Sequence, residues 1–203
     1  MTNNDAIRRA VAWVAILNAA YFGVEFAVGI SIRSVSLIAD SIDFLEDASI
    51  NVLILVGLGL ALATRARLGS VLAIIIAIPG IAAFVAAVDK FLHPTIPGAW
   101  ELSATAFGAL LVNATAAVIL SRVKHHAHSL VQAAWLSARN DVLANAAIIG
   151  AALATLLIPS AYWDVAVGLA IGVLNADAAV KVWRRSRSDA KVEDATSTSA
   201  SSF

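Results

Sequence analysis

Six long apolar runs constrain the fold of this chain more than any other feature of its sequence. Each run is close to, or longer than, the roughly 20 residues that an α-helix needs to cross a bilayer. Short polar linkers separate them. The sequence therefore predicts an all-α, polytopic membrane protein with six transmembrane helices. The runs are residues 11–32, 36–63, 68–88, 100–120, 130–158 and 162–182.

The composition agrees with a membrane protein and excludes several classes of function. Of the 203 residues, 60% are hydrophobic and only 14% are charged, whereas soluble domains average about 45–50% and about 25%. The chain has no cysteine, which excludes disulfides and thiolate metal sites. Its formal net charge is zero, so no basic field indicates a nucleic-acid partner. The first apolar run is too long for a signal peptide.

The distribution of Lys and Arg predicts the orientation. Eleven of these residues fall on the side of the N-terminus, whereas only Arg33 and Lys90 fall on the other. Positive charge marks the cytoplasmic side, so we expect both termini in the cytoplasm. The expected domains are a cytoplasmic N-terminus (1–9), a six-helix transmembrane domain (10–183) and a disordered cytoplasmic tail (184–203). We expect the protein in the cytoplasmic membrane of a bacterium.

The second apolar run contains four acids, which are costly in hydrocarbon. Asp40, Asp43, Glu46 and Asp47 lie within eight consecutive positions. On a helical wheel the three aspartates share an arc of about 60°. Asp40 is near the start of the run, where it is open to solvation or to helix capping. Asp47 lies about 16 Å into the helix, where water reaches only through a cavity.

The fifth apolar run presents a matching polar face. Ser137 and Asp141 are separated by four residues and therefore share one side of a helix, and Asn140 and Asn145 lie within the same half of the wheel. Arg139 lies nearly opposite. A purely structural ion pair would place a cation beside Asp141, and Arg139 is better placed for another helix, with Glu46 as a candidate partner.

Antiparallel packing of these two runs predicts a cation site. It would place Asp43 level with Asp141, and Asp47 level with Ser137. Three carboxylates and a hydroxyl around one point suit a divalent cation. Crowded, desolvated carboxylates also bind protons readily, and a site that holds either a metal or protons is what an exchanger needs.

These segments resemble those of the cation diffusion facilitator (cation efflux) family. "SVSLIADSIDFLEDASI" is similar to the family's second helix, "AAWLSARNDVLAN" to its His-x-x-x-Asp fifth helix, and "NAAYFGVEFAVGI" to its first. The resemblance implies a transporter and not an enzyme: a short form without the C-terminal cytoplasmic domain that exports a divalent cation of the Zn, Co, Fe or Mn class by antiport with protons. It needs no cofactor. The transport site that the resemblance implies consists of Asp43, Asp47, Ser137 and Asp141.

Two departures from the family pattern affect this interpretation. Ser137 stands where the fifth helix usually has His, so Asn140 is an alternative fourth ligand. All-oxygen ligation favours Mn²⁺ or Mg²⁺ over Zn²⁺, although the affinity order still allows Zn²⁺ or Co²⁺. The residues after 183 are too few for the usual cytoplasmic domain, which leaves its regulation and its dimer contacts in doubt.

Smaller motifs leave alternatives open. His125, His126 and His128 are either a metal-capturing loop or part of an ordinary basic interface loop. The motif "GLAIG" (168–172) has spacing that allows close helix approach, within the chain or in a homodimer. Asn18 and Glu25 share a face of the first run, and we expect that face to line the cavity or to contact the second run.

Two other functions fit parts of the pattern. A membrane scaffold or regulator derived from such a transporter would explain the missing His. An intramembrane aspartyl protease also uses paired aspartates, but it requires a Gly-x-Gly-Asp-like loop, and Asp141 lies in "SARND". The protease is therefore disfavoured.

Overall fold

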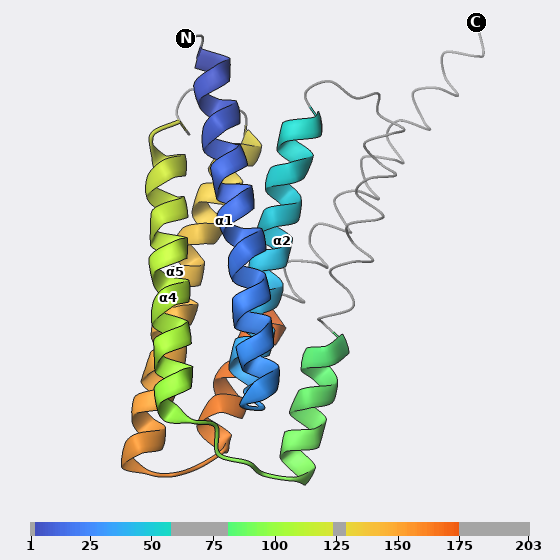
Figure 1. Ribbon diagram of the computed structural model, residues 1–203, viewed down its shortest axis with the longest axis vertical. Helices are drawn as coiled ribbons and strands as arrows, with labels where there is room; N and C mark the ends of the chain where they lie inside the picture. Colours follow the sequence, from blue (N-terminus) through green and yellow to red (C-terminus); the bar gives the residue numbers. More distant parts are fainter. Residues whose placement is uncertain (1–2, 58–80, 124–128, 175–203) are drawn as a thin grey trace, which may run out of the picture. The chain divides into compact units, whose positions relative to one another are not determined.

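The computed structural model describes residues 3–57, 81–123 and 129–174, and every regular element among them is a helix (Figure 1). The all-α prediction is therefore confirmed. Residues 1–171 form one compact unit and residues 172–203 a second, of which only 172–174 are described. The labelled helices are α1 (Asn3–Ser31), α2 (Val35–Gly57), α4 (Ala99–Ser121) and α5 (Ser129–Leu157); residues 81–92 and Tyr162–Leu174 are also helical.

Where the structure describes them, the helices follow the apolar runs, but α1 begins before its run and the helix at 81–92 ends after its run. α1 begins at Asn3, because the polar start of the chain continues the helix and Asp5 in its first turn favours the positive helix end. The helix at 81–92 ends just before Pro94, because a proline restricts the residue that precedes it. Pro79-Gly80 lies inside the third apolar run, where the sequence predicts a kink. This pair, the histidine loop 125–128 and the tail 184–203 lie outside the described residues.

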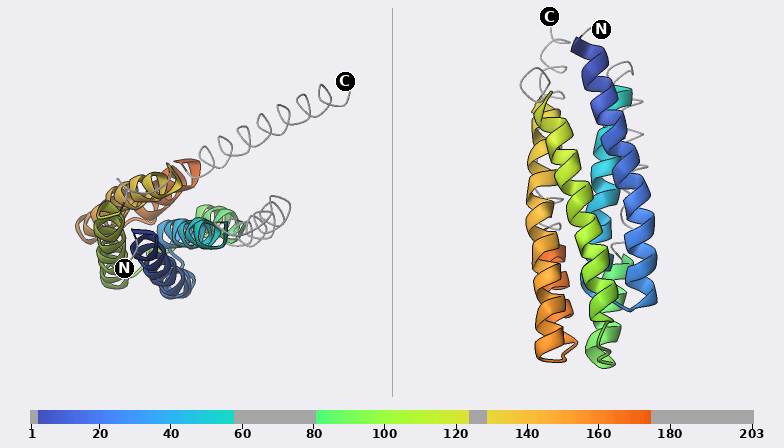
Figure 2. Two further views of the ribbon diagram at one scale, coloured as in Figure 1. Left: turned by 90° about the horizontal axis from the view of Figure 1, so that it is seen from above. Right: turned by 60° about the vertical axis from the view of Figure 1, so that its left-hand side comes forward.

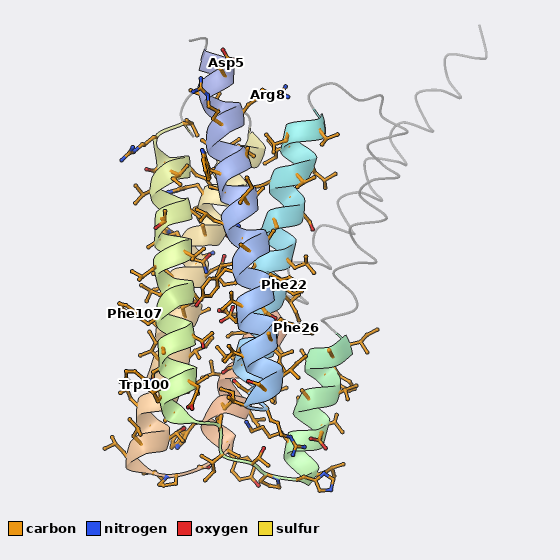
Figure 3. The ribbon with its side chains drawn as sticks, viewed as in Figure 1. Asp5, Arg8, Phe22, Phe26, Trp100 and Phe107 are labelled. Carbon is orange, nitrogen blue, oxygen red and sulfur yellow. The ribbon has the colours of Figure 1, made fainter. Side chains whose placement is uncertain are left out.

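Three of the described helices have the length and apolar composition of membrane spans. Asp5–Ser31, Ala99–Ser121 and Ala134–Leu157 are each long and apolar enough to cross a bilayer. Large apolar side chains cover their outer surfaces, and in Figure 3 Trp100 and Phe107 project outward from α4. Exposed apolar surface on this scale suits contact with lipid and not with water.

Four helices form the core of the first unit. α1 packs on α2, α4 packs on α5, and α1·α4 and α2·α5 contacts join the two pairs; Figure 2 shows this arrangement from above and from the side. One apolar cluster, including Val11, Leu120 and Val131, fills the end where α1 begins. A second, including Leu37, Leu102 and Ile148, fills the other end. Buried polar side chains lie between the two clusters.

The N-terminal end of α2 is fixed by Asp164, a residue to which the sequence pattern gave no role. Asp164 is fully buried and accepts hydrogen bonds from the amides of Val35 (2.8 Å) and Ser36 (3.2 Å). It also accepts from the hydroxyls of Ser34 (2.7 Å) and Ser36 (2.5 Å). Lys90 is only 2% exposed and pairs with Asp164 at 2.7 Å. Lys90 follows the third apolar run (68–88), where a loop is expected, but it lies in the helix at 81–92 with its side chain buried.

The connection from α1 to α2 turns at Arg33. Its φ of 54° is in the left-handed region, and its carbonyl accepts a 2.7 Å hydrogen bond from Lys90 Nζ. Its guanidinium donates to exposed Asp89. That hydrogen bond holds the pKa of Asp89 below its ordinary value.

Gly168, the first glycine of "GLAIG", packs within the chain. A Cβ atom there would lie 2.8 Å from the backbone of both Val35 and Ser36. The absence of a side chain therefore allows the helix Tyr162–Leu174 to approach the start of α2 closely. The homodimer stays a prediction.

Candidate metal site

The four acids of α2 are withdrawn from solvent to different degrees. Asp40 is 0% exposed and Asp47 is 4% exposed, while Asp43 and Glu46 are partly buried. Asp40 is thus neither solvated nor a helix cap, in contrast to what its position near the helix start suggested. Its carboxylate points into the bundle, where Asn145 of α5 donates a 2.8 Å hydrogen bond to Oδ2.

The polar face of α5 is divided by the packing of the bundle. Ser137 and Asp141 are partly buried, whereas Asn140 is exposed. Exposed Arg139 lies with its guanidinium carbon 5.4 Å from the centroid of the Trp135 ring. Among the described residues it forms no ion pair with Glu46. The prediction that Arg139 stays away from the face of Asp141 agrees with this position.

The two polar faces meet across the α2–α5 contact. Asp43 and Asp141 interact electrostatically, and Asp47 interacts with the Ser137 hydroxyl and with Asp141. These are the pairings expected from antiparallel packing. The carboxylates lie along the interface and do not surround one point, since no three His, Asp or Glu side chains of the described residues are close enough together to hold a metal ion.

Comparison with known families agrees with this arrangement of acids on membrane helices. The profile of the cation efflux transmembrane domain matches residues 11–189, which is most of the chain. The protein belongs to the cation efflux family. No curated protein matches the sequence.

Membership of the cation efflux family makes this protein a metal cation transporter of the cation diffusion facilitator type. Members of the family are transporters and not enzymes, and the apolar helices are those of an integral membrane protein. The positions of the metal ligands and the coupling to protons are argued below as proposals.

Two further residues of this cation efflux protein, Asn145 and Glu25, lie beside the acids of α2, and the sequence pattern did not include them among the expected ligands. Asn145 donates from Nδ2 to Asp40 Oδ2 and also to the carbonyl of Asp141, both at 2.8 Å. It therefore links the buried acid of α2 to the polar turn of α5. Its position four residues after Asp141 was the available signal. Glu25 of α1 is 0% exposed and interacts with Asp40, so the predicted contact between its face and α2 is confirmed.

Between the two apolar clusters lies a layer of buried polar side chains, and several atoms of this polar layer have no hydrogen-bond partner among the described residues. Such groups are costly in a membrane interior and indicate functional positions in transporters. Within the described part of the chain, the buried side-chain atoms of this layer that lack a partner are both polar atoms of Asn18, both carboxyl oxygens of Glu25, and one oxygen each of Asp40, Asn51 and Asn145.

Lys90 and Arg33, which lie near the start of α2, form ion pairs with other acids. Lys90 is paired with Asp164, and Arg33 is paired with Asp89. The acids of α2 and Asp141 of α5 therefore lie at the α2–α5 interface, and no described Lys or Arg forms an ion pair with them.

Proposed function

We propose that this transporter exports a divalent metal ion from the cytoplasm in exchange for protons. In this proposal, Asp43 and Asp47 of α2 and Ser137 and Asp141 of α5 hold the cargo. The supporting observation is that acids from two packed helices face one another while no described Lys or Arg pairs with them.

The energetics of this face favour alternate occupation by a metal and by protons. Several carboxylates at one buried interface repel one another when all are ionised. A divalent cation removes that repulsion through direct coordination, and protons remove it by neutralising the acids. Each state is therefore stable while a bare, fully ionised site is not, which favours exchange of one cargo for the other.

In this proposal the metal ion itself brings its ligands together. Asp43, Asp47 and Asp141 lie along the α2–α5 contact but do not converge. We expect an entering cation to draw these carboxylates together by side-chain rotation, since flexible oxygen ligands adapt to the ion that they bind. Release then follows when protons replace the metal.

The ligand types favour a hard cation. Carboxylate and hydroxyl oxygens suit Mn²⁺ or Mg²⁺, and the general affinity order still allows Co²⁺ or Zn²⁺ to bind. Exposed Asn140 is less well placed than partly buried Ser137 to serve as the fourth ligand. The positive-inside rule assigns the side with more Lys and Arg to the cytoplasm. Export across the cytoplasmic membrane of a bacterium would therefore move the metal away from that side.

A flux assay in proteoliposomes tests the proposal. Mn²⁺, Zn²⁺, Co²⁺, Fe²⁺ and Cd²⁺ are supplied in turn, with a pH-sensitive dye inside the vesicles. We expect flux of at least one ion with opposite proton movement, and a loss of about tenfold or more in Asp47→Asn and Asp141→Asn. Glu101→Gln, which alters an exposed acid at the start of α4, is the matched control. Equal flux in all four proteins would rule out this site.

Thermal melting separates transport from a scaffold role. A ligand that binds the folded state raises the midpoint of unfolding. We expect the transported ion to raise the midpoint of the wild type and not that of Asp47→Asn. A scaffold or regulator that has lost transport would show no metal-dependent shift in either protein.

A further inference from the structure

We infer that Glu25 of α1 and Asp40 of α2 form a proton-holding carboxyl pair beside the metal site, with the proton on Glu25. This inference rests on the proposed exchange of metal for protons and adds a dedicated proton carrier that is not a metal ligand. It concerns a pair of acids on α1 and α2, whereas the proposed ligands lie on α2 and α5.

The two carboxyl groups lack a hydrogen-bond donor between them when both are ionised, because a carboxylate can only accept hydrogen bonds. Glu25 and Asp40 are each 0% exposed and interact with one another. Within the described structure, neither Glu25 oxygen nor Asp40 Oδ1 has a hydrogen-bond partner. A single proton on Glu25 lets its Oε–H donate to Asp40 Oδ1, which gives a partner to one oxygen on each side. Paired acids that share one proton in this way are known in other buried sites.

The surrounding hydrogen bonds place the charge on Asp40 and the proton on Glu25. Asn145 Nδ2 donates to Asp40 Oδ2 at 2.8 Å, and a hydrogen bond to a carboxylate favours its ionised form. Glu25 receives no such bond from the described residues. Its neutral form therefore costs less in this apolar layer than its charged form.

The groups that face the pair supply no counter-charge. Tyr21 of α1 faces both acids, but its hydroxyl donates to the carbonyl of Thr105 at 2.6 Å. From α2, Asp43 faces Glu25, and from α5, Asp141 lies within electrostatic range of Asp40. These neighbours are acids or a neutral phenol, so they favour a retained proton while the metal site is empty of cations.

Asn145 connects the pair to the transport site. The same amide that bonds Asp40 also donates to the carbonyl of Asp141 at 2.8 Å. When a divalent cation occupies Asp43 and Asp141, its positive charge favours ionisation of Glu25. The O–H bond of Glu25 then breaks, and the proton leaves to the cytoplasm as the metal enters from it. After the metal is released outside, a proton from that side reprotonates Glu25.

Infrared difference spectroscopy tests the protonation directly. A protonated carboxyl group has a C=O stretching band that an ionised carboxylate and an amide lack. Because protonated ligand carboxyls absorb in the same region, the test is the difference between the wild-type and variant spectra at neutral pH. We expect one component of this band to be absent in Glu25→Gln and present in Glu101→Gln. Asp40→Asn should keep the band but shift its frequency, because the acceptor changes. A spectrum that is unchanged by Glu25→Gln would overturn the inference.

Coupled flux measurements test the role of the proton in exchange. Mn²⁺, Zn²⁺ and Co²⁺ are used in turn in vesicles that report both metal and pH. In Glu25→Gln we expect downhill metal flux to continue, with the number of protons moved per metal ion reduced by about one. An unchanged ratio would contradict the inference, and so would loss of the metal-dependent shift in melting midpoint, which would make Glu25 a metal ligand.

The two proposals can fail separately. Absence of metal flux in the wild type would reject the proposed exchange, whereas the infrared band would still show whether Glu25 holds a proton. Normal flux without that band would reject the proton pair and leave the metal site intact.

Discussion

Lys90 Nζ lies 2.7 Å from Asp164 Oδ2, and both side chains are almost completely buried. The pair joins the helix at 81–92 to the start of the helix Tyr162–Leu174. Asp164 also accepts hydrogen bonds from the first two backbone amides of α2. The helix that carries four acids is therefore fixed at its first turn by another acid, whose charge is neutralised by a buried lysine.

Replacement of Lys90 by Met should destabilise the protein strongly. Removing one partner of a buried ion pair leaves an uncompensated charge and costs about 3–5 kcal/mol. We expect a lower midpoint of thermal unfolding in detergent. Arg33→Met is the control, because it breaks an exposed pair with Asp89 and should change the midpoint little. Equal effects of the two substitutions would show that the Lys90–Asp164 pair contributes no more than a surface pair.

The exposed pair itself makes a prediction about pH. The hydrogen bond from Arg33 lowers the pKa of Asp89 from its ordinary value of 3.8. Its contribution to stability is therefore complete above that value and is lost as pH falls through the lowered pKa. Titration of the Asp89 carboxyl by NMR should give a low pKa in the wild type and a value nearer the ordinary one in Arg33→Gln. The same titration curve in both proteins would contradict the pairing.

Gly168→Ala should be destabilising because its new Cβ would lie 2.8 Å from backbone atoms of Val35 and Ser36. Overpacking of this kind costs about 1–3 kcal/mol, measured as a lower unfolding midpoint. Gly23→Ala in α1 is the matched control, since nothing lies within 4 Å of a Cβ at that position. A neutral result at Gly168 would mean that the two helices separate easily.

Asn145→Ala should cost about 1–3 kcal/mol of stability, because it removes the hydrogen-bond donor to Oδ2 of the buried Asp40 carboxylate. Asn140→Ala, at an exposed position of the same helix, should have little effect. Chemical denaturation in mixed micelles compares the two. A larger loss at Asn140 would mean that the polar face of α5 is turned differently.

Ser137→His should change which metal is carried. An imidazole beside Asp141 supplies a nitrogen ligand that suits Zn²⁺ better than Mn²⁺, so the ratio of Zn²⁺ to Mn²⁺ flux should rise by about tenfold or more. Competition between the two ions in proteoliposomes measures this ratio. If selectivity is the same in both proteins, Ser137 does not contact the cargo.

The facing of the acids of α2 and α5 could be predicted from residue spacing, whereas their role as metal ligands stays a prediction. The four-residue separations of Asp43 from Asp47 and of Ser137 from Asp141 placed each pair on one helical face. Antiparallel packing then supplied the cross-pairs that the structure brings within electrostatic range. The role of Asp164 could not be predicted, because a single acid at the start of an apolar run carries no periodic signal.

The amino-acid sequence by itself determined the helices, their family and the faces that carry acids, because helix length and periodicity are local properties of the chain. Only the tertiary structure decided which acids are buried together and which are paired. Asp40, for which solvation was one expectation, is a buried acceptor of a hydrogen bond from Asn145. Lys90, which follows the third apolar run, is a buried counter-ion of Asp164. Burial and pairing depend on neighbours that are distant in the chain, so no local pattern specifies them.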